Sequence, residues 1–280
     1  MNTQNRHRRL LPMVAAIALA GFASGAWAVS TWTASACGGP SDPSLVSAGN
    51  TGSCSVGGVT ATVSAWSNTA SSSSGHLGTT TTLTPGTFEA AKLVLYGNNY
   101  GITNQNPSGS PDTETTVPNH AIDNDTNVDM VLLKFDTSIA LSAFTLGYTN
   151  NDSDVTVLRY AGATSGSTTA ASLMNGKSLS NLTASNGWTL VDSYSNVTGT
   201  KSITGGASSS WWLISAYNST IGGVKSWTDT NLDYFKLLSF AGNTVAPPPP
   251  PGVPEPGSLA LAAFAAFGAF AARRRSKQVH

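Results

Sequence analysis

The stretch Val155-Thr-Val-Leu-Arg-Tyr160 alternates between two sets of side chains along its whole length. In a β-strand successive side chains point to opposite faces, so Val155, Val157 and Arg159 face one way and the three residues between them face the other. β-branched and aromatic residues of this kind are enriched in strands. The stretch therefore predicts a β-strand.

Similar short runs occur through the middle of the chain, separated by clusters of Gly, Asn, Ser and Thr. The run Val131-Leu-Leu133 is apolar at every position, which indicates a central strand covered on both faces. No long helical pattern and no repeat of fixed period is seen, which disfavours solenoids and propellers. About eight strands in residues 29–246 predict an all-β ectodomain, an antiparallel β-sandwich or jelly roll. The expected strands are 60–66, 91–96, 130–135, 143–148, 155–160, 189–194, 211–216 and 234–240. Surface loops are expected at 71–75 and 98–118.

Charge is scarce and unevenly placed. Charged residues are only 10% of the 280-residue chain, against roughly a quarter in an ordinary soluble domain. Seven of the 14 basic residues and 13 of the 14 acidic ones lie within 29–246, so this part carries a net charge of −6. It lacks the basic face that neutralises phosphates, which argues against nucleic-acid binding.

Residues 1–28 have the parts of a secretory signal peptide. Three arginines precede residue 10, an apolar run continues to about residue 21, and Ala26 and Ala28 supply the small residues that signal peptidase needs. We expect cleavage after Ala28. The alternative is that the segment is retained as a membrane anchor.

The C-terminal end combines an extended segment, a short apolar segment and a basic cluster. Residues 247–252 form a proline-rich linker, and the motif Val253-Pro-Glu-Pro256 follows it. The apolar segment 258–272 would span about 22 Å as a helix, short of the roughly 30 Å hydrocarbon core. It can still cross as a single transmembrane helix if flanking side chains snorkel or the bilayer thins. The arginines after it place the C-terminus in the cytoplasm, so the ectodomain lies outside the inner membrane.

This order of features resembles the PEP-CTERM sorting signal, over residues 253–280. The resemblance implies that an integral-membrane exosortase cuts near the motif and releases or transfers the protein to the surface of an exopolysaccharide-producing Gram-negative cell. Prolines on both sides of the motif glutamate keep the backbone extended, and an extended peptide beside the membrane is one that a membrane transpeptidase could grip. The alternative is a plain single-span anchor with an accidental Pro-Glu-Pro. The matching residues are Pro254, Glu255 and Pro256 in the motif, and Arg273, Arg274 and Arg275 as the membrane stop.

Four ectodomain segments also resemble a family of exosortase-dependent surface proteins. The role implied by that resemblance is structural or unknown, so no active site is carried over from it. The segments are 118–124, 129–135, 152–160 and 233–239.

The two cysteines, Cys37 and Cys54, belong to an exported chain, so a disulfide is the default expectation. It would stabilise the domain by roughly 3 kcal/mol in the chain-entropy model. Two free thiols or a metal site are the alternatives, but no neighbouring histidine or third cysteine supports a metal.

Oxygen-bearing side chains recur at alternate positions after residue 122, as in a calcium-binding loop. Val128 stands where an EF-hand-type loop needs glycine, and Lys134 stands where it needs an acidic residue. The loop is therefore not an EF-hand. The candidate ligands are Asp123, Asp125, Asn127 and Asp129.

A calcium site could also include Asp152 and Asp154, from the next Asx-rich turn. However, short Asp and Asn side chains commonly cap turns by bonding their own backbone. We favour this second interpretation, so no cofactor is expected and Ca²⁺ is the alternative.

Catalytic motifs are missing from the sequence. It has no Gly-x-Ser-x-Gly elbow, no His-Glu-x-x-His helix and no glycine-rich phosphate loop. His120 is expected to order its loop rather than act as a base, and no spacing singles out a glycosidase carboxylate pair. We predict that the protein is not an enzyme. A cryptic secreted hydrolase is an alternative.

Trp211 and Trp212 are adjacent in an expected strand, so their side chains point to opposite faces. One of them is therefore a candidate for an exposed contact with a sugar ring, although filling the core is the ordinary role of tryptophan. A carbohydrate-binding module that uses exposed aromatics is thus another alternative.

Together these features predict an exported, non-enzymatic surface or extracellular-matrix protein. An exosortase would sort and cleave it after an inner-membrane intermediate, and it would then be associated with exopolysaccharide or biofilm. The expected partners are the exosortase and exopolysaccharide, and no nucleic acid is expected.

Overall fold

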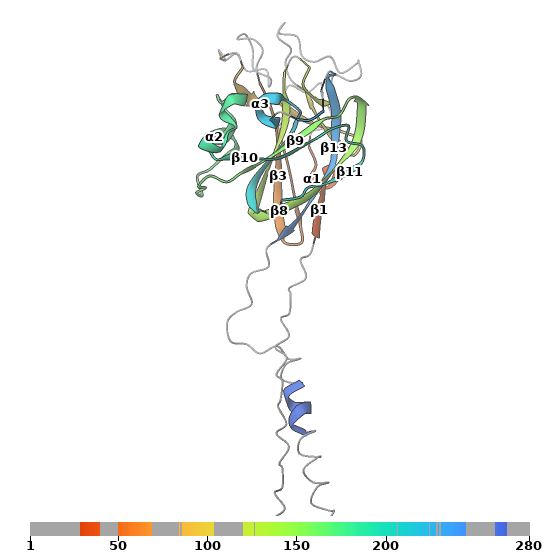
Figure 1. The fold of residues 1–280 in the computed structure, drawn as a ribbon, viewed down its shortest axis with the longest axis vertical. Helices are drawn as coiled ribbons and strands as arrows, with labels where there is room; N and C mark the ends of the chain where they lie inside the picture. Colours follow the sequence, from red (N-terminus) through yellow and green to blue (C-terminus); the bar gives the residue numbers. More distant parts are fainter. Residues whose placement is uncertain are drawn as a thin grey trace, which may run out of the picture.

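The computed structural model describes residues 29–39, 50–68, 84, 86–103, 120–125, 127–205, 207–223, 225–227, 229, 231–244 and 261–267. Within them, thirteen strands are hydrogen-bonded into one antiparallel sheet, which confirms the all-β prediction (Figure 1). The strands are β1 (Val29–Thr33), β2 (Thr51–Val56), β3 (Val59–Asn68), β4 (Phe88–Ala90), β5 (Lys92–Tyr96), β6 (Asn99–Thr103), β7 (Ile122–Asp123), β8 (Asp129–Asn151), β9 (Val155–Tyr160), β10 (Trp188–Tyr194), β11 (Thr200–Ser202), β12 (Ser209–Ala216) and β13 (Asp233–Thr244). The short helices are α1 (Ala34–Cys37), α2 (Ala170–Met174) and α3 (Ser219–Gly222), with 3-10 turns η1 (Leu179–Asn181) and η2 (Ala184–Asn186).

The sheet has two parts, and the long strand β8 belongs to both of them. Its first part pairs with β12 and β3, and its second part pairs with β13 and β11. The prediction of two separate strands, 130–135 and 143–148, is wrong because the chain continues as one 23-residue strand. Asp136, Thr137 and Ser138 lie between the two parts and are exposed, so their polarity marks a change of strand partners rather than a turn.

The predicted alternation in β9 is confirmed. Val155 and Val157 belong to the main hydrophobic cluster, whereas Leu158 belongs to a second cluster that includes Met174 of α2. Strand β8 shows the same division, with Leu132 in the second cluster and its two neighbours in the first. These central strands are therefore covered on both faces.

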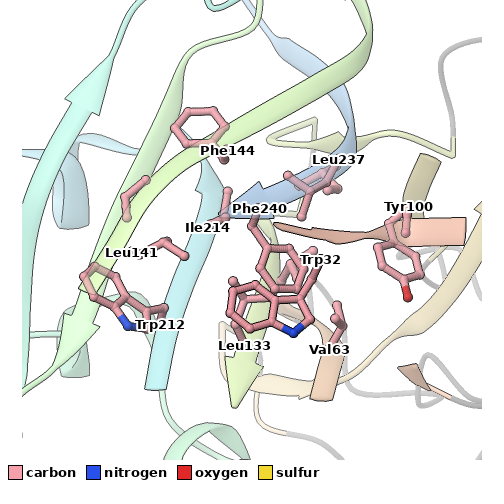
Figure 2. Packing of buried hydrophobic residues seen from close by; sticks show 14 of the residues in the cluster. Trp32, Val63, Tyr100, Leu133, Leu141, Phe144, Trp212, Ile214, Leu237 and Phe240 are labelled. Atoms are coloured by element: carbon pink, nitrogen blue, oxygen red, sulfur yellow. The ribbon is translucent and has the colours of Figure 1, made fainter. Parts of the chain in front are cut away.

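Aromatic rings fill the main cluster between the two parts of the sheet (Figure 2). The Trp32 ring of β1 stacks on Phe240 of β13 with 5.7 Å between centroids, and meets Phe135 of β8 edge-on at 5.0 Å. The Trp32 Nε1–H donates to the carbonyl of Val59 at 3.2 Å, so the polar atom of this buried ring is satisfied. Since Phe135 and Phe240 lie in different parts of the sheet, the two parts face each other across these rings.

The two ends of the domain lie side by side. Val29 of β1 pairs with Asn243 of β13, and the start of β1 and the end of β13 lie at one end of the domain in Figure 1. Strand β13 begins at Asp233, and its 12 residues cover roughly 40 Å at about 3.3 Å per residue. We call the end of the domain at Asp233 the distal end.

Part of one expected loop is a strand. Residues 99–103 of the predicted 98–118 loop form β6, which pairs with β5, because their apolar side chains are buried in the core. The remainder of that loop up to residue 118, and the expected loop 71–75, lie outside the described residues.

The alternative in which Trp211 or Trp212 is exposed is wrong, and both tryptophans take the ordinary role of filling the core. Both are at most 3% exposed, because β12 is a central strand between β9 and β8 and both of its faces are covered. The Trp212 Nε1–H donates to the carbonyls of Ile139 and Ser209 at 3.2 and 3.0 Å. Trp211 packs in the second cluster, on the opposite face.

The predicted disulfide between Cys37 and Cys54 is confirmed, and it joins α1 to β2. The two elements approach closely at Gly52. A Cβ at this position would overlap the carbonyl oxygen of Gly38 and would lie 2.6 Å from the Tyr100 hydroxyl. The absence of a side chain at residue 52 therefore permits this approach.

Candidate functional site

Several aspartates meet at the distal end of the domain. The chain leaves β8 at Asn151, whose left-handed backbone (φ 60°) is one that asparagine tolerates, and turns directly into β9. Asp233, the first residue of β13, pairs with Asn151. The distal acidic cluster consists of Asp152, Asp154, Asp229 and Asp233.

Asp233 ties three segments together. Its Oδ1 accepts a hydrogen bond from the backbone N–H of Asp154 at 2.5 Å, and its Oδ2 accepts one from the Asn124 side chain at 2.7 Å. In return the Asn124 Oδ1 accepts from the backbone N–H of Asp233 at 2.8 Å, and Asn124 also donates to the carbonyl of Tyr217 at 2.9 Å. These bonds fix the turn before β9 and the start of β13 against the segment that follows β7.

Two more carboxylates of the cluster are held by backbone groups. Asp154 Oδ1 accepts from the N–H of Asn196 at 2.6 Å, and Asp152 Oδ1 accepts from the N–H of Ser153 at 2.8 Å. Asp152 and Asp154 are at most 8% exposed, and Asp233 is fully buried. Charged groups are rarely buried in this way unless they are paired or bind a metal ion.

The geometry of three of these carboxylates suits one cation. Asp152, Asp154 and Asp229 each offer a carboxylate oxygen, and these oxygens lie within 4.8 Å of one another. Ca²⁺ takes oxygen ligands at 2.3–2.6 Å, so oxygens with this separation can share one ion. A cavity of about 420 Å³ opens beside the cluster and is lined in part by Asn124, Asp229 and Asn231. It offers solvent access and further amide oxygens.

Burial and mutual repulsion raise the pKa values of the cluster. The pKa of Asp233 rises to about 8, first through burial and then through the charges of Asp154, Asp229 and Asp152, against a hydrogen bond from the Asp154 N–H. Burial raises the pKa of Asp154 to about 6, opposed by its bond from the Asn196 N–H and aided by the neighbouring carboxylates. The pKa of Asp229 is raised as well, mainly by burial. A bound cation would favour the charged forms and offset this cost.

The 123–129 loop, for which a calcium site was the alternative, has side chains bonded within the loop and to its neighbours. Asp123 Oδ1 accepts from the backbone N–H of Asp125 at 3.1 Å, and Asp125 Oδ2 accepts from the Tyr234 hydroxyl at 3.0 Å. Asn127 and Asp129 are buried at the start of β8. Within the described ranges, the aspartates of this loop do not belong to a group of three or more Asp, Glu, His or Cys side chains that could hold one metal ion.

Sequence reasoning identified Asp152 and Asp154 but missed Asp229. The missed signal is the stretch Asp229-Thr-Asn-Leu-Asp233, where oxygen-bearing side chains again occupy alternate positions. It has the same spacing as the 123–129 loop. Only the pairing of β13 with β8 shows that this second stretch lies beside Asp152.

His120, the histidine considered as a base, lies in an aromatic stack. Its ring is 4.1 Å from the Tyr96 ring, centroid to centroid. The ammonium of Lys236 lies 4.2 Å from the centroid of the Tyr96 ring. By stacking on Tyr96 of β5, His120 holds the chain before β7 against that strand.

The predicted targeting residues lie outside the described residues. These are Ala26, Ala28, Pro254–Pro256 and Arg273–Arg275. Within the expected span 258–272, residues 261–267 form an exposed helix. Across the described ranges, no helix has both the length and the apolar character needed to cross a membrane.

Comparison with protein families identifies a sorting motif. Residues 252–275 match the PEP-CTERM protein-sorting motif, as the resemblance over 253–280 predicted. The motif implies processing by an exosortase and export toward the cell surface. Searches of curated proteins and of solved structures gave no match.

Proposed function

We propose that this chain, which carries a PEP-CTERM protein-sorting motif, is an exported, non-enzymatic surface protein with a sandwich-like ectodomain. The observation that carries the proposal is the motif match at 252–275, which begins eight residues after the end of β13. An exosortase would cut near the motif and release the ectodomain or transfer it to the cell surface.

The positions of the ends support this order of events. The signal peptide 1–28 directs export. Its removal after Ala28 removes no residue of β1, because that strand begins at Val29. The segment 258–272 holds the inner-membrane intermediate, with Arg273–Arg275 in the cytoplasm. A cut near Pro254–Pro256 then leaves the ectodomain on the stiff linker 247–252.

At the surface, the protein associates with exopolysaccharide or biofilm matrix. The low charge of the chain and its many Gly, Ser, Thr and Asn residues suit a hydrated polymer. A structural role is also supported by the sequence, which lacks the hydrolase motifs named above.

The sorting proposal is tested by the intact mass and C-terminal peptide of the protein recovered from the surface fraction of its native host. A mature chain that starts at Val29 and ends near Pro254–Pro256 is the expected result. Glu255→Gln should leave residues 259–280 attached, while Asp136→Asn, an exposed ectodomain carboxylate, should be processed normally. Recovery of the unaltered protein with Leu259–His280 still attached would mean a permanent membrane anchor and would end the matrix proposal.

We also propose that the distal acidic cluster binds a divalent cation such as Ca²⁺. The observation that favours it is the set of three carboxylate oxygens within 4.8 Å of one another, from Asp152, Asp154 and Asp229. Two of these side chains are buried, so ionising all three without a cation is unfavourable. The ion would lock the turn before β9 to the segment before β13.

A further inference from the structure

A groove of about 630 Å³ lies between β10 and β11. Among the described strands, β10 pairs only with β9 and β11 pairs only with β8, so each is an edge strand. They belong to different parts of the sheet, and residues 195–199 carry the chain from one wall to the other. At Thr204 the groove meets a smaller pocket of about 190 Å³. We call the two together the edge groove.

The larger part of the edge groove combines hydroxyl groups with aromatic rings. Trp227 is half-buried, and the Tyr217 ring packs against it with 4.8 Å between centroids, which holds it in place. Tyr194 also lines the groove, and the ammonium of Lys201 lies 5.2 Å from the centroid of its ring. The lining residues that bring hydroxyl groups to the groove are Ser195, Thr200, Ser202 and Thr204, whereas the Ser193 hydroxyl is buried and donates to the carbonyl of Gly222.

This lining matches the surface of a sugar. A sugar ring presents an apolar C–H face, which packs on an aromatic ring, and a rim of hydroxyls, which exchange hydrogen bonds with serine and threonine. A lipid would instead need a mainly aliphatic lining. The volume of the larger part falls within the roughly 300–1,000 Å³ typical of ligand sites.

The charge of the edge groove is opposite to that of the domain. Residues 29–246 contain only seven basic residues, and two of them line the edge groove, while a third pairs with its acidic lining residue. Arg159 lines the smaller pocket, Lys201 lines the larger part, and Lys225 pairs with Asp192 at 2.8 Å. Among the described lining residues Asp192 is the only acidic one, and it is already neutralised by that pair. The groove therefore has a local positive excess in a domain of net charge −6.

We propose that the edge groove binds an acidic polysaccharide, a chain of sugars that carry carboxylates. Trp227 stacks on one sugar ring, and Lys201 and Arg159 pair with carboxylates of the chain. The join at Thr204 lets a single polymer occupy both parts of the groove. This proposal rests on the proposed function, because it names the matrix polymer with which the protein associates. Binding in the groove itself does not depend on sorting.

Binding is measured by titration calorimetry on the purified full chain with three polymers. Polygalacturonate is the carboxylated polysaccharide, dextran is the neutral one, and polyglutamate is a polyanion without sugar. We expect saturable binding to polygalacturonate, at least about tenfold tighter than to either of the others. Trp227→Ala and Lys201→Gln should each weaken it by about tenfold. Lys177→Gln removes an exposed cation outside the groove and should leave the affinity unchanged.

Three outcomes would overturn the proposal. They are the absence of saturable binding to polygalacturonate, equal binding to polyglutamate, and affinity that neither Trp227→Ala nor Lys201→Gln alters. A lower melting temperature of Trp227→Ala would mean that this variant also disturbs the fold. The affinity of Lys201→Gln then decides whether the groove binds the polymer, because this change removes a charge and leaves the Tyr217–Trp227 packing in place. The titration uses purified protein, so its failure is distinguishable from a failure of sorting, which the C-terminal peptide reports.

Discussion

The backbone N–H of Asp154 donates a 2.5 Å hydrogen bond to Oδ1 of Asp233, a residue 79 positions further along the chain. This bond joins the turn before β9 to the first residue of β13. It also holds two carboxyl groups where water has little access, so burial raises the pKa of both, and the charge of Asp154 raises the pKa of Asp233 further. The stability of the distal end should therefore depend on cations and on protons.

Ca²⁺ is expected to raise the melting temperature of the full chain, because the ion binds the folded cluster and not the separated aspartates. At a hundredfold excess over Kd the gain is about 2.7 kcal/mol, or about 5–10 °C for a domain of this size. Asp229→Asn should abolish most of this shift, which calorimetry in Ca²⁺ and in EDTA measures. Asp136→Asn is the matched control and should show the full increase in melting temperature on addition of Ca²⁺. Identical melting curves with and without the ion would remove the site.

In EDTA, the free energy of unfolding is expected to decrease as pH rises from about 5 to 8. An unfolded aspartate has a pKa of about 3.9, whereas burial raises the pKa of Asp154 to about 6 and that of Asp233 to about 8. Between these values the folded state binds more protons, so this contribution is fully present below about pH 4 and is lost as pH rises through the folded pKa values. Denaturant titrations at pH 5, 6.5 and 8 would measure it. A constant or increasing free energy over that interval contradicts the raised pKa values.

Trp212→Ala and Trp211→Ala should each lower the free energy of unfolding by about 3–5 kcal/mol, because both rings are buried. Trp212→Phe should cost less, since it keeps most of the volume and loses only the donor to Ile139 and Ser209. Denaturant titration compares the variants. Trp227→Phe, at a half-buried ring, is the control and should be nearly neutral. If Trp211→Ala were also neutral, the second cluster would not be a closed core.

Gly52→Ala is expected to destabilise the protein by about 1–3 kcal/mol, as overpacking of a tight contact does. The added methyl would meet the carbonyl oxygen of Gly38, which the disulfide-linked α1 holds in place. Gly166→Ala is the matched control, because that position has open space and no left-handed backbone. Melting temperatures measure both effects. Equal melting temperatures for the two variants would show that residue 52 has room for a methyl group beside the carbonyl oxygen of Gly38.

The strands that the sequence predicts well are those with dense apolar patterns. The strand expected at 155–160 has those bounds as β9, because its alternation reflects two distinct hydrophobic clusters. Strands β1 and β2 were missed, since Ser, Thr and Gly also mark turns and only the pairing with β13 and β3 makes these segments strands. The uninterrupted course of β8 is likewise decided by its partners.

The candidate site likewise depends on strand pairing that the local sequence does not reveal. Alternating oxygen side chains pointed to the 123–129 loop, but that pattern is equally suited to bonds within a turn, as Asp123 and Asp125 show. Asp152 meets Asp229 only because β13 is antiparallel to β8, a contact that local composition does not encode. The burial of Trp211 and Trp212 depends in the same way on the central position of β12.

The place of β13 in the sheet has a mechanical consequence. The strand lies between β1 and β8, and the chain continues from it to the PEP-CTERM motif at 252–275. A pull on Thr244 against a load at the opposite end acts along β13, while the hydrogen bonds to both neighbours run across it. Those bonds then share the force in shear and do not open one after another from an end. If the protein is held at its C-terminal end in a polymer matrix, as proposed, tension would act along this shear direction.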